Sequence, residues 1–279
     1  MAGREGTPHS SFRTIAVLTL VPVVALLGFV VWWLLPSATE HPTRSAAPPQ
    51  PVAAAVTSPP PFAGSIVLIL DDFGFDGQPI ERAMQLDPDI NFAILPNGNR
   101  ATDFAHRLNR RGFEVLCHLP MEPIGPASPG RNAILTSMTD EEIIRVVREN
   151  LRAVPHARGV NNHMGSRATA DRRVMATVLG ALPDGMYFVD SRTGSQSVAE
   201  VVAREMRVRT AARHVFLDDV RTRAAVRQQL AALASMARER GVAVGIAHPH
   251  QVTLDVLAEE IPRLRESGFR FLRASSAVN

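Results

Sequence analysis

The sequence contains no lysine, so arginine supplies all 30 of its basic side chains. The formal net charge is only +3, and no run of arginines is interleaved with aromatic residues. The densest basic cluster, Arg107, Arg110 and Arg111, is typical of a solvated helix face. Nucleic-acid binding requires a concentrated basic surface, so we expect no nucleic-acid partner.

Cysteine is also scarce. The single cysteine, Cys117, cannot form a disulfide within the chain, and one thiol indicates neither an oxidising nor a reducing compartment. It lies in the apolar run 113–119, which predicts a buried, unreactive thiol and not a nucleophile. No glycine-rich phosphate loop follows the first strand-like run, 65–70, and its absence argues against a dinucleotide-binding fold.

One long stretch without charge, residues 14–35, has about the length that an α-helix needs to cross a bilayer. Trp32 and Trp33 stand near its far end, where aromatic rings favour the membrane interface, and Arg4 and Arg13 precede it. A cleaved signal peptide has a shorter apolar core. We therefore predict an uncleaved signal anchor, with a cleaved signal peptide as the alternative.

The positive flank of this helix predicts a single-pass protein of the cell inner membrane. Residues 1–13 would lie in the cytoplasm, and residues 14–35 would form the transmembrane helix. Residues 36–63 are rich in Pro and Ala and almost lack large apolar side chains, which predicts an extended linker. Residues 64–279 would then form one globular domain outside the cytoplasm, in the periplasm.

Short apolar runs alternate with helix-period segments throughout residues 64–279. The strand-like runs are 65–70, 90–95, 113–119, 159–164, 186–190, 214–218, 242–248 and 269–272. Helical patterns cover 140–153, 198–206, 220–240 and 254–267, and Thr139 with Glu142 predicts a capping box for the first of them. Uninterrupted apolar runs are typical of parallel strands covered on both faces. The alternation predicts an α/β fold, an irregular (β/α) barrel of seven or eight units.

Polar or ionisable side chains follow almost every predicted strand. They are Asp71-Asp72, Asn97, His118 with Glu122, Asn161 to His163, Asp190 to Arg192, Asp218-Asp219, and His248 with His250. In parallel α/β folds the carboxyl ends of the strands share one edge, and reactive groups collect there. The sequence therefore predicts a functional site at this edge.

The adjacent pair Asp71-Asp72 is the most informative of these groups. Two carboxylates in a confined site repel each other unless a cation lies near them. A divalent metal would let one aspartate act as a ligand while the other stays free as a base. Zinc accepts carboxylate and imidazole ligands and keeps one position for water in catalytic sites, so two histidines and one aspartate would suffice. Spacing alone does not choose among the candidate histidines, His118, His163, His248 and His250.

The predicted strand ends carry, in order, LILDDFG, FAILPNG, EVLCHLPMEP, GVNNHMGSRAT, FVDSRT, HVFLDD and GIAHPHQVTL. Together these motifs resemble the divergent polysaccharide deacetylase family, which is related to the carbohydrate-esterase, or NodB-like, deacetylases. The likeness covers essentially the whole predicted domain, from Ser65 to Ala274. It implies a barrel of the glycoside hydrolase/deacetylase type and a divalent metal cofactor, with Zn²⁺ expected.

The resemblance also implies roles for individual residues. Asp71 looks like the catalytic base, and His248 looks like the histidine that protonates the leaving group. Asp72, His118 and His163 look like the metal ligands. The family's usual pair of histidines four or five residues apart is absent after His118, so the second histidine ligand has to come from the next strand.

A further set of polar residues is expected beside the ligands or the substrate. It comprises Asn162, Asp190, Arg192 and His250. Asp190 is the residue we expect to orient His248 or a ligand, with a structural strand cap as the alternative. Arg192 is expected to contact an anionic part of the substrate or to form an exposed ion pair.

The function implied by the resemblance is that of a metal-dependent hydrolase acting on cell-envelope carbohydrate, such as a peptidoglycan-type glycan, by N- or O-deacetylation. Two alternatives stay open at this point. One is a non-catalytic envelope module that binds glycan or protein on the same barrel. The other is a metal-independent glycoside hydrolase that pairs Asp71 with Glu122 or Asp190.

Overall fold

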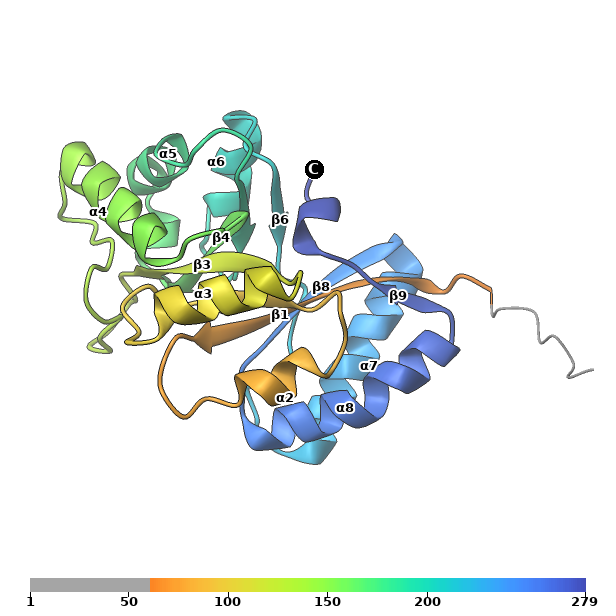
Figure 1. Cartoon of the computed structure of the whole chain (residues 1–279). Helices are drawn as coiled ribbons and strands as arrows, with labels where there is room; N and C mark the ends of the chain where they lie inside the picture. The colour runs from red at the N-terminus through yellow and green to blue at the C-terminus, as the bar shows by residue number, and fades with distance from the viewer. Residues whose placement is uncertain (1–60) are drawn as a thin grey trace, which may run out of the picture. The chain divides into compact units, whose positions relative to one another are not determined.

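The computed structural model describes residues 61–279, and a parallel sheet organises them (Figure 1). The strands are β1 Gly64–Phe73, β2 Asn91–Ile94, β3 Glu114–Met121, β4 Gly159–Met164, β5 Tyr187–Asp190, β6 Thr210–Ala212, β7 Val215–Phe216, β8 Val242–Ala247 and β9 Phe269–Phe271. Their order is β6-β5-β4-β3-β2-β1-β8-β7, and β9 pairs with the first residues of β1. The predicted cytoplasmic segment, the membrane helix and nearly all of the linker lie outside the described residues.

The sheet curls into a barrel with a seam between its edge strands β6 and β7. Only Arg213 and His214 separate these two strands along the chain. The Arg213 N–H donates to the Asp190 carbonyl of β5, and the His214 N–H donates to the Val244 carbonyl of β8. This short link therefore bridges the two ends of the sheet without a β6–β7 ladder. The predicted irregular (β/α) barrel is confirmed.

Helices cover the outer face of the sheet in two groups (Figure 1). The helices are α2 Ile80–Met84, α3 Ala101–Arg110, α4 Asp140–Ala153, α5 Arg172–Gly180, α6 Ala199–Glu205, α7 Arg223–Arg240 and α8 Gln251–Glu266, with short 3₁₀ turns η1 Ala168–Ala170 and η2 Ala274–Ser276. Helices α4, α5 and α6 pack together on one side, and α7 packs on α8 on the other. None of the helices within residues 61–279 combines the length and apolar character needed to cross a bilayer.

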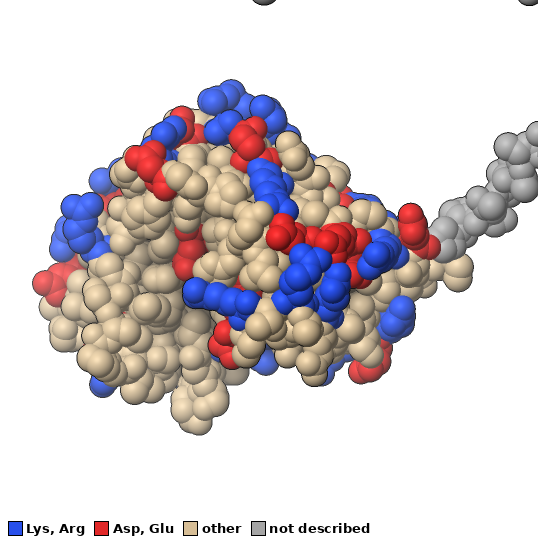
Figure 2. Space-filling model, turned by 90° about the horizontal axis from the view of Figure 1, so that it is seen from below, with Lys and Arg blue, Asp and Glu red and all other residues tan. Residues whose placement is uncertain are grey.

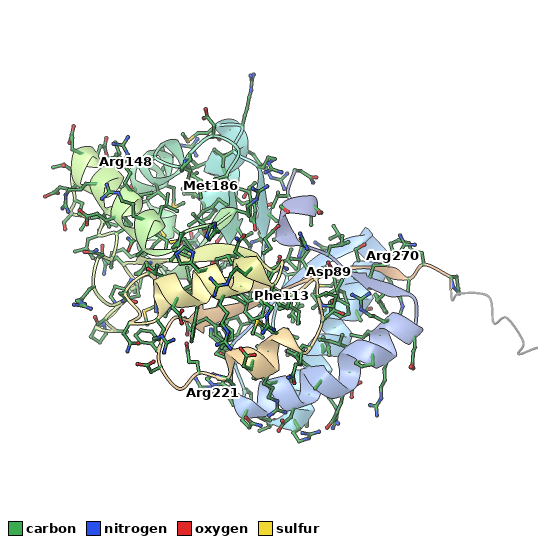
Figure 3. All side chains as sticks on the ribbon, in the orientation of Figure 1. Asp89, Phe113, Arg148, Met186, Arg221 and Arg270 are labelled. Carbon is green, nitrogen blue, oxygen red and sulfur yellow. The ribbon has the colours of Figure 1, made fainter. Side chains whose placement is uncertain are left out.

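The surface of the domain mixes charges of both signs. Figure 2 shows arginines beside aspartates and glutamates on one face, next to a broad uncharged area. Ion pairs such as Arg227 with Glu260, which joins α7 to α8, belong to this surface pattern. Arg148 of α4 and Arg270 of β9 are exposed on far sides of the domain (Figure 3). Exposed pairs of this kind contribute little to stability, so the core holds the fold together.

Strand β1 shows why its sequence is an unbroken apolar run. Alternate side chains point to opposite faces of a strand. Ile66 and Leu68 pack into the core between the sheet and the helices. Val67 and Ile69 pack into a second core inside the barrel, with Leu116 of β3. Both faces are dry, so both sets of positions need apolar side chains.

The C-terminal segment closes the amino end of the barrel. Asn279 exchanges backbone hydrogen bonds with Thr210 of β6, and Ala274 of η2 and Val278 pack into the core inside the barrel. The buried Glu114 carboxylate accepts hydrogen bonds from the Tyr187 hydroxyl and from the Ser275 backbone and side chain. Because the C-terminal segment fills the amino end of the barrel and side chains fill its interior, space for a ligand remains at the carboxyl ends of the strands.

Candidate metal centre and active site

A local break in β1 brings Asp71 and Asp72 into the same site. In a regular strand, neighbouring side chains point to opposite faces, and Asp71 continues the inward series of Val67 and Ile69. Asp72 has φ 64, and the pairing of β1 with β2 shifts register between Leu70 and Phe73. Such a bulge with one left-handed residue re-aims a side chain at a cost of about 1–3 kcal/mol. The turn therefore carries strain that the surrounding contacts have to hold.

Gln78 holds this turn in place. Its side-chain amide donates to the Asp72 carbonyl at 2.6 Å, and its side-chain oxygen accepts from the backbone N–H groups of Gly74 at 2.8 Å and Phe75 at 2.9 Å. These three hydrogen bonds satisfy backbone groups that the end of β1 leaves unpaired. Gln78 is thus a positioning residue that the sequence did not indicate.

Asp72, His118 and His163 converge on one point. His118 Nε2 lies 3.2 Å from Asp72 Oδ1, and His163 Nδ1 lies 3.0 Å from the same oxygen. The two ring nitrogens are 3.2 Å apart. Neighbouring strands β3 and β4 supply the histidines, as expected when the second histidine comes from the next strand.

The three side chains fit a divalent metal. Asp72 Oδ1 is buried and has no hydrogen-bond partner among the described residues, although two imidazole nitrogens face it. Ligands of a tetrahedral zinc ion with bonds of about 2.1 Å lie about 3.4 Å apart, close to the sides of this triangle. The His118 Nδ1 lies 3.0 Å from Asn161 Oδ1, a contact that leaves Nε2 facing the centre. All three side chains line one cavity, from which a water molecule or a substrate could reach a bound ion.

The charges at this centre are strongly coupled. Burial is the largest influence on Asp72 and raises its pKa, but His118 and His163 together outweigh it, so the pKa lies well below its ordinary value. Burial lowers the pKa of His118, yet Asp71 and Asp72 raise it to about 9. The two carboxylates thus favour the protonated form of His118. A divalent cation would take the place of that proton.

Asp71 lies next to the centre in a different environment. Its side chain is almost completely buried, and Asn161 Nδ2 donates to its Oδ1 at 2.8 Å. Burial is the main cause that raises the pKa of Asp71; Asp72 adds to it, and His118 and His248 oppose it. The adjacent carboxyl groups therefore have pKa values shifted in opposite directions. A lowered pKa suits Asp72 as a metal ligand, and a raised pKa suits Asp71 as a base.

His248 faces the centre from the other side, and Asp218 orients it. His248 Nδ1 lies 3.0 Å from Asp218 Oδ1, and its backbone N–H donates to Asp218 Oδ2 at 2.7 Å. Thr253 donates to the same oxygen at 2.9 Å. His248 Nε2 lies 3.7 Å from Asp72 Oδ2. Burial lowers the pKa of His248, but the Asp218 and Asp71 carboxylates outweigh it and raise the pKa above its ordinary value.

The structure gives Asp218, and not Asp190, as the partner of His248. Asp190 accepts hydrogen bonds from the Arg192 N–H and the Ser197 hydroxyl, both at 2.8 Å, so it caps the turn after β5. This is the structural alternative stated for Asp190. Asp190 ends β5 and Asp218 follows β7, each after an apolar run, and no feature of the sequence tells which carboxylate reaches the histidine.

The other residues expected near the site have different positions. Asn162 lines the cavity and accepts the Ser191 N–H at 2.8 Å. Arg192 pairs with Glu200 at 2.6 Å and lines neighbouring pockets. His250 precedes α8 with its ring 5.8 Å from that of His248. Asp218, His248 and His250 also lie close enough to hold an ion, but three hydrogen bonds already occupy the Asp218 oxygens.

A cavity of about 390 Å³ opens above these groups. Its lining comprises Asp71, Asp72, His118, Pro123, Ala127, Asn162, His163, Met164, Ser166, Ser191, Thr193, Phe216 and His248. Larger pockets occur elsewhere in the domain, but this one holds the convergent ionisable groups that mark a reactive site. Sequence reasoning missed Phe216, an aromatic wall, because apolar residues in a strand-like run resemble core residues.

The sequence profile of the family described as divergent polysaccharide deacetylase matches residues 68–278. The chain belongs to this family.

The chain is also similar to two curated proteins and to one solved structure. The uncharacterized protein YibQ of Escherichia coli is 34% identical over 218 residues, 78% of this chain and 68% of YibQ. An uncharacterized protein of Haemophilus influenzae is 33% identical over 202 residues, 72% of each chain. An uncharacterized protein from Agrobacterium tumefaciens has the same fold, with a TM-score of 0.73 at 21% identity over 78% of this chain and 90% of the other.

Proposed function

We propose that the domain is a metal-dependent hydrolase that removes N- or O-acetyl groups from a cell-envelope glycan. The observation that carries the proposal is the triangle of Asp72, His118 and His163 around a buried oxygen without a hydrogen bond. Asp71 and His248 flank this triangle on the same cavity. Membership of the deacetylase family supports an acyl group on a sugar as the point of attack.

The residues divide the proposed reaction between them. A divalent ion held by the triangle would polarise the acyl carbonyl and lower the pKa of a water molecule. Asp71 accepts a proton from the attacking water as the new carbon–oxygen bond forms. His248, as imidazolium, donates a proton to the nitrogen or oxygen of the sugar as the bond to the acyl carbon breaks. The products are acetate and a free amino or hydroxyl group.

The shifted pKa values support these roles. Asp72 stays ionised over a wide pH range, as a ligand must, while the raised pKa of Asp71 makes it a stronger base than an ordinary carboxylate. Asp218 favours the protonated form of His248, which a general acid needs at neutral pH. Zinc is the metal we propose, because the ligands are two imidazoles and one carboxylate.

The structure disfavours the glycoside hydrolase alternative. That mechanism needs a second carboxyl group across the scissile bond from Asp71. Glu122 accepts two hydrogen bonds from Thr136 and pairs with Arg167. The Asp190 carboxylate accepts hydrogen bonds from Arg192 and Ser197 in the turn after β5. Neither side chain lines the cavity, so neither is placed to act on a sugar there.

The test uses the full-length protein and an acetylated oligosaccharide. We expect zinc at one equivalent per chain, acetate release without new reducing ends, and loss of both metal and activity in Asp72→Asn. Asp103→Asn, which changes an exposed aspartate of α3 that lines neither this cavity nor its neighbouring pockets, is the matched control. A protein that binds no zinc, and whose melting temperature zinc does not raise, would instead be the non-catalytic module.

We also propose that residues 14–35 anchor the domain to the inner membrane with the catalytic face in the periplasm. This proposal is supported only by the apolar stretch and its positive flank. Protease added to spheroplasts should degrade the domain while the membrane stays intact. Protection of the domain until the membrane is lysed would contradict this topology.

A further inference from the structure

A second pocket adjoins the cavity that holds the proposed metal centre. It has a volume of about 640 Å³ and lies where the barrel seam meets α7. Thr193 and Phe216 line both spaces, so the two pockets are immediate neighbours. A cavity of about 390 Å³ with a larger neighbour suits a chain of sugars better than a single small molecule.

Arg213 gives the second pocket a positive charge that no carboxylate pairs with among residues 61–279. Its Nε–H donates to the Ser191 carbonyl at 2.6 Å, and its Nη2–H donates to the Arg192 carbonyl at 2.7 Å. Within residues 61–279 its guanidinium forms no ion pair, unlike Arg192, which pairs with Glu200. Backbone carbonyls therefore fix the direction of this cation without neutralising it.

Burial makes this charge costly. Burial lowers the pKa of Arg213, while Asp190 and Asp71 partly offset the effect through space. Asp219 also lines the pocket, but it is exposed, so water and salt screen its charge more strongly. An anionic group of a ligand would offset the cost of burying the Arg213 charge without a counter-ion. An exposed arginine, which water solvates, has no such cost to offset.

The Phe216 side chain lines both the cavity at the proposed metal centre and the second pocket. Its ring centre lies 5.0 Å from the Arg213 guanidinium carbon and 5.1 Å from the centre of the His248 ring. One aromatic side chain thus touches both the residue proposed to protonate the leaving group and the cation of the second pocket. A ligand lying along Phe216 would place one sugar at His248 and the next at Arg213.

We infer that the second pocket binds the sugar next to the reacting one, and that Arg213 selects glycans in which this sugar carries a carboxylate. The inference rests on the proposed function, since it takes the adjoining cavity to hold the reacting sugar. A planar guanidinium with fixed direction recognises a carboxylate through paired hydrogen bonds. The substrate class is therefore an acidic N-acetylated glycan, and a neutral glycan lacks the group that Arg213 binds.

Binding to two oligosaccharides of equal length tests this inference. One probe is the tetrasaccharide of alternating N-acetylglucosamine and N-acetylmuramic acid, which carries carboxylates; the other is neutral tetra-N-acetylchitotetraose. Full-length protein with Asp71→Asn would bind both probes with turnover slowed by about 10²–10⁴-fold. Hydrogen bonds to charged groups predict a preference of about tenfold or more for the acidic probe in calorimetry. In that background, Arg213→Gln should abolish the preference and leave the affinity for the neutral probe unchanged.

Arg209→Gln is the matched control. Arg209 also donates to backbone carbonyls, those of Gly185 and Ser275, but lies at the other end of β5 and β6. It should keep the full preference for the acidic probe. Equal affinity for the two probes in protein that retains Arg213 would overturn the inference. An equal loss of affinity for both probes in Arg213→Gln, or failure of the acidic probe to bind, would also overturn it.

Acetate release separates this inference from the proposed function. Suppose that wild-type protein, which retains Asp71, releases no acetate, but that the higher affinity for the acidic probe still depends on Arg213. The inference about binding then stands and the proposed reaction fails. If acetate is released from both probes with equal kcat/KM, the proposed reaction stands and the selectivity of Arg213 is refuted.

Discussion

The two ends of the barrel differ at one buried polar group: those named at the amino end have hydrogen-bond partners, whereas one carboxylate oxygen of the site at the carboxyl end has none among the described residues. At the amino end, Glu114 accepts hydrogen bonds from Tyr187 and Ser275, and Asn91 bonds the backbone of Leu272 and Ala274. At the carboxyl end, Asp72 Oδ1 is buried without a hydrogen bond and faces two imidazoles. Buried polar groups are normally satisfied, so the end that leaves one open is the end prepared for a ligand.

The largest expected effect is at the carboxyl end. Asp71→Asn removes the proposed base, and we expect the rate of acetate release to fall by about 10²–10⁴-fold. Metal content should not change, because Asp71 is not a proposed ligand. Elemental analysis and a single-turnover assay measure the two quantities. Loss of the metal in this variant would mean that Asp71, and not Asp72 alone, holds the ion.

A smaller effect is expected at the amino end. Glu114→Ala leaves the buried Tyr187 hydroxyl and the Ser275 donors without their acceptor. We expect the free energy of unfolding to fall by about 1–3 kcal/mol for each donor left unpaired. Urea denaturation gives the stability, and activity per folded molecule should stay at the wild-type value. A stable Glu114→Ala protein with lost activity would contradict the division between the two ends.

The smallest expected effect is a shift in the pH dependence of activity in Asp218→Asn. In the proposed reaction the active form of His248 is protonated, so activity should fall as pH rises through the pKa of His248, which Asp218 helps to raise. Asp218→Asn removes that carboxylate and lowers the pKa of His248. The alkaline limb of the kcat/KM profile should therefore move to lower pH. An alkaline limb that stays in place would exclude His248 as the general acid.

The fold was largely predictable because apolar runs fix the position of buried strands. The runs beginning near Ser65 and Val242 correspond to β1 and β8, and the Thr139 capping box begins α4 as predicted. Strand β6 was missed, because Thr210 and the alanines after it carry too little apolar surface to indicate a strand. Helix α7 begins at Arg223, three residues later than its apolar pattern, because Thr222 caps it.

The site was predictable only in part. Strand ends indicate where polar groups gather, and the structure brings Asp72, His118 and His163 together. Their roles as ligands stay predictions until a metal is measured. The left-handed turn at Asp72 and the choice of Asp218 for His248 depend on distances between elements far apart in sequence. Local pattern contains no information about such distances.

The most direct test of the account is a crystal structure of the zinc-soaked protein with anomalous scattering at the zinc edge. The account predicts one ion bound by Asp72 Oδ1, His118 Nε2 and His163 Nδ1, each at about 2.0–2.2 Å, with an open position towards the cavity. Zinc bound instead by Asp218, His248 and His250, or no zinc peak at the strand ends, would contradict it.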